Sequence, residues 1–195
     1  LTLGDPWHLS TDIGPVIDEA ARKGIADHIA TARSEGRVIA ELQTPDSGTY
    51  IAPTILRVKG ISDLEREIFG PVLHFTTFKS HELDRVIDAI NGTGYGLTFG
   101  LHTRIDDRVQ HVSERITAGN IYINRNQIGA IVGSQPFGGE GLSGTGPKAG
   151  GPNYLPRFSA PDLAETSPAW DSAGTLPDIP THEPRIIDTI SLPGP

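Results

Sequence analysis

Helical and strand-like patterns alternate along residues 1–158, and this alternation most constrains the fold of the chain. Apolar residues recur at helical spacing after Asp18, the predicted N-cap, as far as Gly36. A second helical pattern covers 81–91, with Ser80 as its predicted cap, and a third covers 105–116. Short β-rich runs lie between them, at 37–42, 50–58, 71–78, 96–103 and 120–124. Strands and helices joined by short connections are typical of βαβ units. We therefore expect an α/β fold with a mainly parallel sheet flanked by helices.

The composition changes near residue 158. Residues 159–195 contain seven prolines and six acidic residues but one basic residue, Arg185. Such a segment predicts a linker or extended tail, in which the run 185–192 alone is apolar enough to form a strand. We expect a folded domain over 1–152, a terminal extension over 153–158, and a linker with the start of a following segment over 159–195.

Charge and residue content exclude several classes of function. Lysine and arginine total 16 against 24 acidic residues, a net charge of −8, which argues against a nucleic-acid-binding surface. The chain has no cysteine, so a thiolate metal site and a cysteine nucleophile are excluded within it. Its seven histidines lack the spacings of zinc motifs, and no metal site is expected. The absence of methionine, even at position 1, suggests a piece of a longer protein.

The glycine-rich stretch 136–151, PFGGEGLSGTGPKAGG, contains the pattern G-x-G-x-x-G of dinucleotide-binding loops. That loop requires a strand directly before it and a long helix after it. Here the strand candidate lies well upstream, and Pro147 interrupts both a helix and a phosphate loop ending at Lys148. Two interpretations stay open: a turn in which backbone approaches backbone, and a backbone site for an anion.

A set of collinear motifs resembles the NAD(P)-dependent aldehyde dehydrogenases. The run EIFGPV, which starts at Glu67, is similar to the E-[IV]-F-G-P signature of that superfamily. Five further segments follow the superfamily order: DIGPVID (12–18), APTIL (52–56), INGTGYGLTFGL (90–101), AGNIYIN (118–124) and PFGG (136–139). Residues 124–155 are most similar to the aldehyde dehydrogenase module of the bacterial proline utilisation A family. The terminal SLPGP resembles the start of the segment after that module.

The resemblance implies the catalytic domain of an enzyme that oxidises glutamate-γ-semialdehyde, the hydrolysed form of Δ1-pyrroline-5-carboxylate, to glutamate with NAD. By family order the nucleophilic cysteine, the glutamate base and the dinucleotide-binding domain precede Leu1. No catalytic residue is therefore expected in this chain, which should be inactive alone and bind NAD weakly or not at all. In the cofactor site, Glu67 would accept hydrogen bonds from the nicotinamide ribose, and Phe69 would pack near the nicotinamide.

The resemblance also implies substrate-binding residues. The N–H groups of Gly129 and Ala130 would bind the substrate carboxylate, and Phe137 would pack on its methylene chain. Asn124 is expected to be a structural residue at a strand end. The whole enzyme would be a cytoplasmic homo-oligomer. Two alternatives remain: a dehydrogenase for a different aldehyde, and a non-catalytic aldehyde-dehydrogenase-like module used in assembly.

Overall fold

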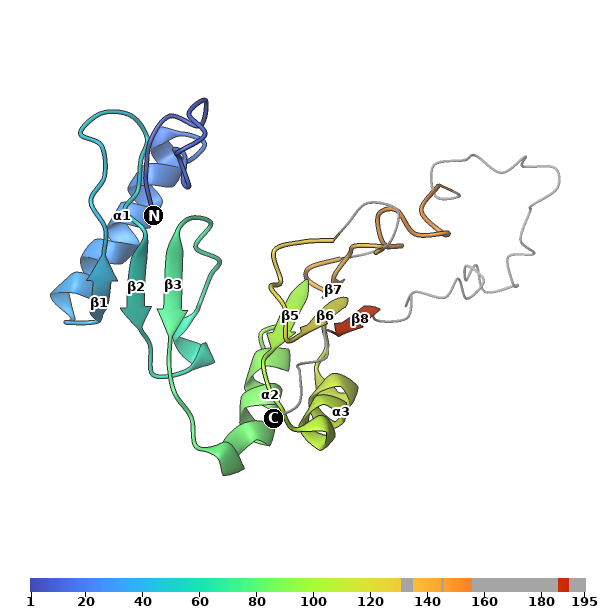
Figure 1. The fold of residues 1–195 in the computed structure, drawn as a ribbon. Helices are drawn as coiled ribbons and strands as arrows, with labels where there is room; N and C mark the ends of the chain where they lie inside the picture. The colour runs from blue at the N-terminus through green and yellow to red at the C-terminus, as the bar shows by residue number, and fades with distance from the viewer. Residues whose placement is uncertain (131–134, 145, 156–185, 190–195) are drawn as a thin grey trace, which may run out of the picture. The chain divides into compact units, whose positions relative to one another are not determined.

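The computed structural model describes residues 1–130, 135–144, 146–155 and, for the backbone, 186–189. The chain divides into two units, Leu1–Glu82 and a second that starts at Leu83 (Figure 1). Each unit has its own sheet and its own hydrophobic core, and we describe them separately.

Unit 1 packs one long helix on a three-stranded sheet of order β1-β2-β3 (Figure 1). Strand β2 pairs antiparallel with β1 and parallel with β3. The elements are α1 Glu19–Ser34, β1 Val38–Glu41, β2 Thr54–Arg57, η1 Ile61–Asp63, β3 Val72–Phe75 and η2 Ser80–Glu82.

Helix α1 confirms the predicted helix start and buried face. The Asp18 carboxylate accepts a hydrogen bond from the Ala21 N–H at 2.7 Å, which satisfies one of the free amides of the first turn. Ile25 and Ile29 recur at helical spacing and pack with Ile51 in the core of unit 1. Burying each such isoleucine contributes about 1.5–3 kcal/mol.

Unit 2 contains a βαβ unit, in which α3 connects the parallel strands β5 and β6. The backbone of β8 pairs in parallel with the other edge of β6, and β4 pairs antiparallel with β7. The elements are α2 Leu83–Asn91, β4 Tyr95–Gly96, β5 Thr98–Leu101, α3 Asp106–Arg115, β6 Asn120–Ile123, β7 Glu140–Gly141 and β8 Ile186–Thr189.

Strand β6 lies at the centre of unit 2, and all four of its residues are buried. Ile121 and Ile123 pack with Ile87 of α2 and with Val112 of α3, so both helices cover the same face of the sheet. The side chain of Asn91 ties the two helix ends together: it donates to the Arg115 carbonyl and accepts from the Thr117 N–H, both at 2.8 Å.

The α/β class is confirmed, but the expectation of one mainly parallel sheet is not. The described residues form three small sheets, with both parallel and antiparallel pairs. A strand pattern identifies the segments that form strands, whereas the choice of partner depends on long-range contacts that the pattern does not contain.

Two local predictions have different outcomes. Ser80 is not the cap of α2, because Ser80–Glu82 form the separate turn η2 and the helix begins at Leu83. Glu82 closes that turn: its N–H donates to the Lys79 carbonyl at 2.8 Å, and its carboxylate accepts from the Lys79 N–H at 3.2 Å. The predicted strand within 185–192 is confirmed by β8, and the remainder of the 159–195 tail lies outside the described residues.

No helix in the described part of the chain is both long and apolar enough to cross a membrane.

Two glycines of the α1 region should respond in opposite directions to the same substitution. A Cβ at Gly24, inside α1, or at Gly36, just after it, would meet no atom within 4 Å, but Gly36 has φ +69°. Gly24→Ala should stabilise unit 1 by about 0.5–1 kcal/mol through helix propensity. Gly36→Ala should destabilise it by about 1–2 kcal/mol because of the left-handed backbone. Urea unfolding followed by circular dichroism would measure both, and shifts of the same sign would contradict this explanation.

Candidate functional site

Alternate side chains of the segment 67–71 lie on opposite sides of its backbone. Ile68 packs against the core of unit 1, while Glu67 and Phe69 on either side of it are exposed, Phe69 by 82%. Gly70 lies close to α1, because a Cβ there would be 2.5 Å from the end of the Ile25 side chain. An aromatic ring this exposed, held on a segment packed at its neighbours, is available to a ligand or another part of a protein.

Hydrogen bonds connect this segment to β3. The Gly70 N–H donates to the Ile68 carbonyl at 2.9 Å, and the Val72 N–H donates to the Gly70 carbonyl at 2.7 Å. The Pro71 carbonyl accepts a hydrogen bond of 3.0 Å from the N–H of Thr54, the first residue of β2. The segment is therefore an entry turn into β3, and the same turn presents Glu67 and Phe69 to solvent.

The second group of predicted residues lies on the loop after β6. Because side chains alternate along a strand, Asn120 and Tyr122 face away from the core that Ile121 and Ile123 fill. The Tyr122 hydroxyl donates to the Gly129 carbonyl at 3.2 Å. Tyr122 therefore holds the outgoing arm of the loop.

Asn120 holds the returning arm of the same loop. Its Nδ2 donates to the Pro136 carbonyl at 3.1 Å, and its Oδ1 accepts from the Gly138 N–H at 3.2 Å. The backbone of Phe137 also pairs with Ala149 through two hydrogen bonds, of 3.0 and 2.9 Å. The Phe137 side chain stays half-buried within this rigid backbone.

The structure thus fixes both Gly129 and Phe137 to the polar face of one strand. Gly129 and Ala130 are half-buried, and a Cβ at Gly129 would meet no atom of the described residues within 4 Å. Residues 131–134 lie outside the described part of the chain. Glu67 and Phe69 belong to unit 1 and the loop residues to unit 2.

The glycines of 136–151 allow backbone to pack against backbone, as one of the two interpretations predicts. A Cβ at Gly119 would be 1.8 Å from the Gly138 carbonyl oxygen, and one at Gly144 would be 2.2 Å from the Gly139 oxygen. Among its described residues the stretch forms a short strand, turns and bends, without the helix that a dinucleotide loop requires.

No motif in the sequence indicates the roles of Asn120, Tyr122 and Lys148. The Lys148 side chain is buried, 4% exposed, and its ammonium donates to the Gly119 carbonyl at 2.7 Å. Polar side chains at alternate positions of a strand, as in NIYIN, are the only sequence signal for the first two. Asn124 is a structural residue as predicted: it has φ +59°, and its Oδ1 accepts from the Thr103 N–H at 2.9 Å.

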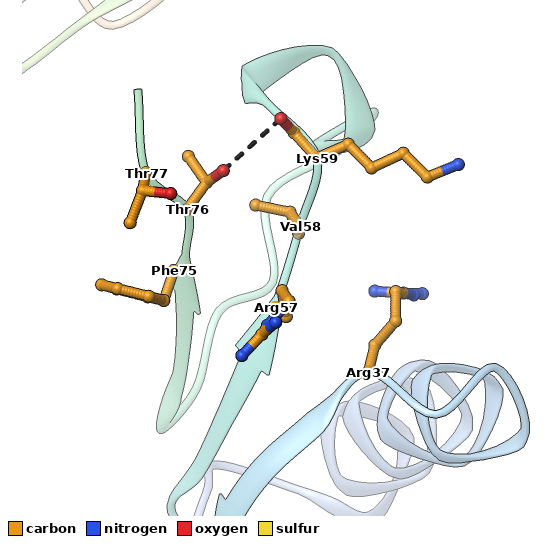
Figure 2. Close-up of a pocket in the computed structure, with 7 residues that line it drawn as sticks. All are labelled: Arg37, Arg57, Val58, Lys59, Phe75, Thr76 and Thr77. Atoms are coloured by element: carbon orange, nitrogen blue, oxygen red, sulfur yellow. Dashed lines mark hydrogen bonds between the residues drawn. The ribbon is translucent and has the colours of Figure 1, made fainter. Parts of the chain in front are cut away.

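A hollow with three basic side chains lies at one end of the unit 1 sheet. Arg57 and Phe75 are register partners on neighbouring strands, and Arg37 and Lys59 line the hollow with them, as Figure 2 shows. The Thr76 hydroxyl is 3.4 Å from the Lys59 carbonyl oxygen. None of the residues predicted to bind cofactor or substrate lines this hollow. In the described residues no three His, Asp or Glu side chains gather as metal ligands.

The rings of His28 and His74 meet between α1 and β3, with their Nε2 atoms 2.9 Å apart. Partial burial lowers the pKa of His28, and the nearby charges of Arg66 and Arg37 lower it further. Burial also lowers the pKa of His74, with smaller effects from His28 and Arg37. Both rings are therefore held in the neutral form at neutral pH.

The chain belongs to the aldehyde dehydrogenase family, whose model matches residues 1–162. Among curated relatives, the bifunctional protein PutA of Rhizobium meliloti is 55% identical over 175 residues, which cover 88% of this chain and 14% of that protein. The 1-pyrroline-5-carboxylate dehydrogenase of Bacillus cereus (strain B4264) is 42% identical over 158 residues, covering 80% of this chain and 30% of the relative.

A solved structure agrees with the family assignment. A mutant of proline utilization A from Bradyrhizobium japonicum matches with a TM-score of 0.79 and 49% identity, covering 82% of this chain and 16% of that one. The resemblance inferred from the motifs is confirmed. The chain spans only about one seventh of the PutA relative and less than a third of the 1-pyrroline-5-carboxylate dehydrogenase.

The histidine pair predicts how the stability of unit 1 depends on pH. In the unfolded chain both rings titrate near pH 6.5, whereas the lowered pKa values mean that the folded state binds protons less well. The free energy of unfolding should therefore be highest above about pH 7 and fall as the pH drops below about 6.5.

Thermal melts of the wild type and of His74→Gln between pH 5.5 and 7.5 would measure this effect. The wild-type midpoint should fall more steeply with acid than that of His74→Gln. His81→Gln, which alters an exposed histidine of the same unit, is the matched control and should keep the wild-type slope. Parallel curves for wild type and His74→Gln would refute the assignment.

Proposed function

We propose that this chain forms the C-terminal part of the catalytic domain of an enzyme that oxidises glutamate-γ-semialdehyde to glutamate with NAD, in proline catabolism. The proposal is supported mainly by the loop after β6, where Asn120 and Tyr122 hold Phe137 and Gly129 on one face of a buried strand. The similarity to PutA and to 1-pyrroline-5-carboxylate dehydrogenase supports the same substrate. Residues 1–152 would form the catalytic-domain part, 153–158 its extension and 159–195 the linker.

The loop residues suit a short chain that carries a carboxylate. Gly129 and Ala130 have no bulky side chain, so an anion can approach their N–H groups closely. The half-buried ring of Phe137 provides an apolar surface for the methylene groups of the substrate. In this proposal the loop binds and orients the non-reacting end of the aldehyde, and the reacting carbonyl is placed by the rest of the enzyme.

Glu67 and Phe69 are chemically suited to NAD, which supplies the hydride acceptor when bound. Glu67 is an exposed carboxylate and can accept hydrogen bonds from both hydroxyls of a ribose. The exposed Phe69 ring can pack beside a flat heterocycle. Both side chains sit on a turn whose backbone is packed against the core through Ile68 and against α1 at Gly70.

The chain contains no cysteine, so the thiol that attacks the aldehyde in this family would come from residues outside it. The dinucleotide-binding domain would also come from outside, in a cytoplasmic homo-oligomeric enzyme. We therefore propose that this chain alone is inactive.

The separate chain should bind NAD weakly, because Glu67 and Phe69 contact only one end of the dinucleotide. Isothermal titration calorimetry should give a dissociation constant in the millimolar range, or no measurable binding. In the full-length enzyme, Glu67→Gln should raise the KM for NAD about tenfold, because it removes a charged acceptor. Glu65→Gln, a nearby exposed glutamate, is the matched control and should leave it unchanged. Micromolar NAD binding by the separate chain would contradict the proposed division of the site.

Substrate profiling of the full-length enzyme tests the aldehyde. The enzyme should prefer glutamate-γ-semialdehyde to propanal, and Phe137→Ala should raise the KM for the semialdehyde about tenfold or more. Phe78→Ala, which removes an exposed phenylalanine outside the loop, serves as the control. A full-length enzyme without preference for the semialdehyde would favour a different aldehyde, and one without any dehydrogenase activity would favour an assembly module.

A further inference from the structure

We propose that Lys148 is a positioning residue for the substrate loop: its buried ammonium, acting with Asn120, holds Phe137 in place. This inference rests on the proposed function, because it gives Phe137 the role of contacting the substrate. Lys148 lies eleven residues after Phe137 along the chain, in the part of the glycine-rich stretch that follows Pro147.

Lys148 buries a charged group. Lys148 is 4% exposed, and its Nζ lies 2.7 Å from the carbonyl oxygen of Gly119. Gly119 is the residue immediately before β6. Removing an ammonium from water is strongly unfavourable unless it is well hydrogen-bonded. A lysine used only to fill space would be replaced by an apolar side chain of similar length without this cost. The buried charge therefore points to a role in setting the geometry of the loop.

Lys148 also contacts the residues around Phe137. A Cβ at Gly138 would lie 3.0 Å from Cγ of Lys148 and 3.2 Å from its Cα, so the lysine stem lies directly against the Gly138 backbone. The residue after the lysine, Ala149, makes both backbone hydrogen bonds with Phe137. Lys148 therefore packs against the residue after Phe137, and its own neighbour Ala149 pairs with Phe137.

The contacts of Asn120 and Lys148 join the same two segments, 119–120 and 136–138. Asn120 binds the peptide groups on both sides of Phe137, at Pro136 and Gly138. The Lys148 ammonium binds Gly119, the residue next to Asn120 in the chain. Phe137 stays half-buried, while the peptide groups on both sides of it are bound by Asn120 and its own backbone pairs with Ala149. Loss of either support should let the ring move while β6 stays in the core.

The experiment compares Lys148→Met, which keeps the length of the stem but removes the donor, with wild type in the full-length enzyme. The KM for glutamate-γ-semialdehyde should rise about 10- to 100-fold, because a displacement of about 1 Å has effects of this size. The kcat for the semialdehyde and the KM for propanal, which is too short to reach the loop fully, should change less than about twofold. Lys148→Arg, which keeps a cationic donor, should recover most of the loss. Lys79→Met, at an exposed lysine, is the matched control.

A second measurement does not depend on activity. The 195-residue chain, labelled at its six phenylalanines with 4-fluorophenylalanine, should show a shifted or broadened Phe137 fluorine signal in Lys148→Met but not in Lys79→Met. The spectrum of Phe137→Leu assigns the signal. If Lys148→Met fails to fold by circular dichroism, Lys148→Gln takes its place, because it keeps a neutral donor.

The outcomes separate this inference from the function on which it rests. A selective rise in the semialdehyde KM, with a moved Phe137 signal, supports the proposal. Equal losses for both aldehydes with a lower melting temperature, or no change in KM and in the fluorine signal, would overturn it. If the wild type does not oxidise the semialdehyde, the proposed function fails, and the fluorine spectra still decide whether Lys148 holds Phe137.

Discussion

The burial of strand β6 on both faces is the constraint on which unit 2 depends. On one face Ile121 and Ile123 complete a core with Ile87 of α2 and Val112 of α3. On the other face the buried polar groups of Asn120 and Tyr122 need hydrogen-bond partners, and the backbones of Gly129, Pro136 and Gly138 supply them. The same requirement that stabilises the strand therefore holds these three described positions of the loop. A scaffold and a candidate binding loop are joined here through a single four-residue strand.

The glycine-rich stretch follows from this arrangement. Its segment must lie so close to β6 that the Gly119 backbone and the Gly138 carbonyl leave no room for a Cβ. Glycines that resemble a phosphate-binding pattern are needed here for close packing, and the buried ammonium of Lys148 is bound to a backbone carbonyl. Short motifs such as G-x-G-x-x-G indicate a cofactor only when the flanking strand and helix are also present.

Unit 1 presents its candidate cofactor residues by a simpler mechanism. The turn 67–71 places Ile68 in the core and Gly70 against α1, which leaves Glu67 and Phe69 facing solvent. The packed and exposed residues alternate, so a single turn both starts β3 and displays two side chains. The His28–His74 contact lies on the side of β3 that faces α1, and the neutral state of the two rings is a consequence of that packing.

The sequence by itself determined the α/β class, the helix with its Asp18 cap, the positions of the four-residue strands and the family, because these depend on local periodicity, capping and motif order. It also identified Glu67, Phe69, Gly129, Ala130 and Phe137 as candidates, through resemblance. Only the tertiary structure decided that the strands divide among three sheets, and that Asn120, Tyr122 and Lys148 hold the loop. These depend on contacts between residues such as Lys148 and Gly119, 29 positions apart, and no local pattern records which distant backbone group a side chain will meet.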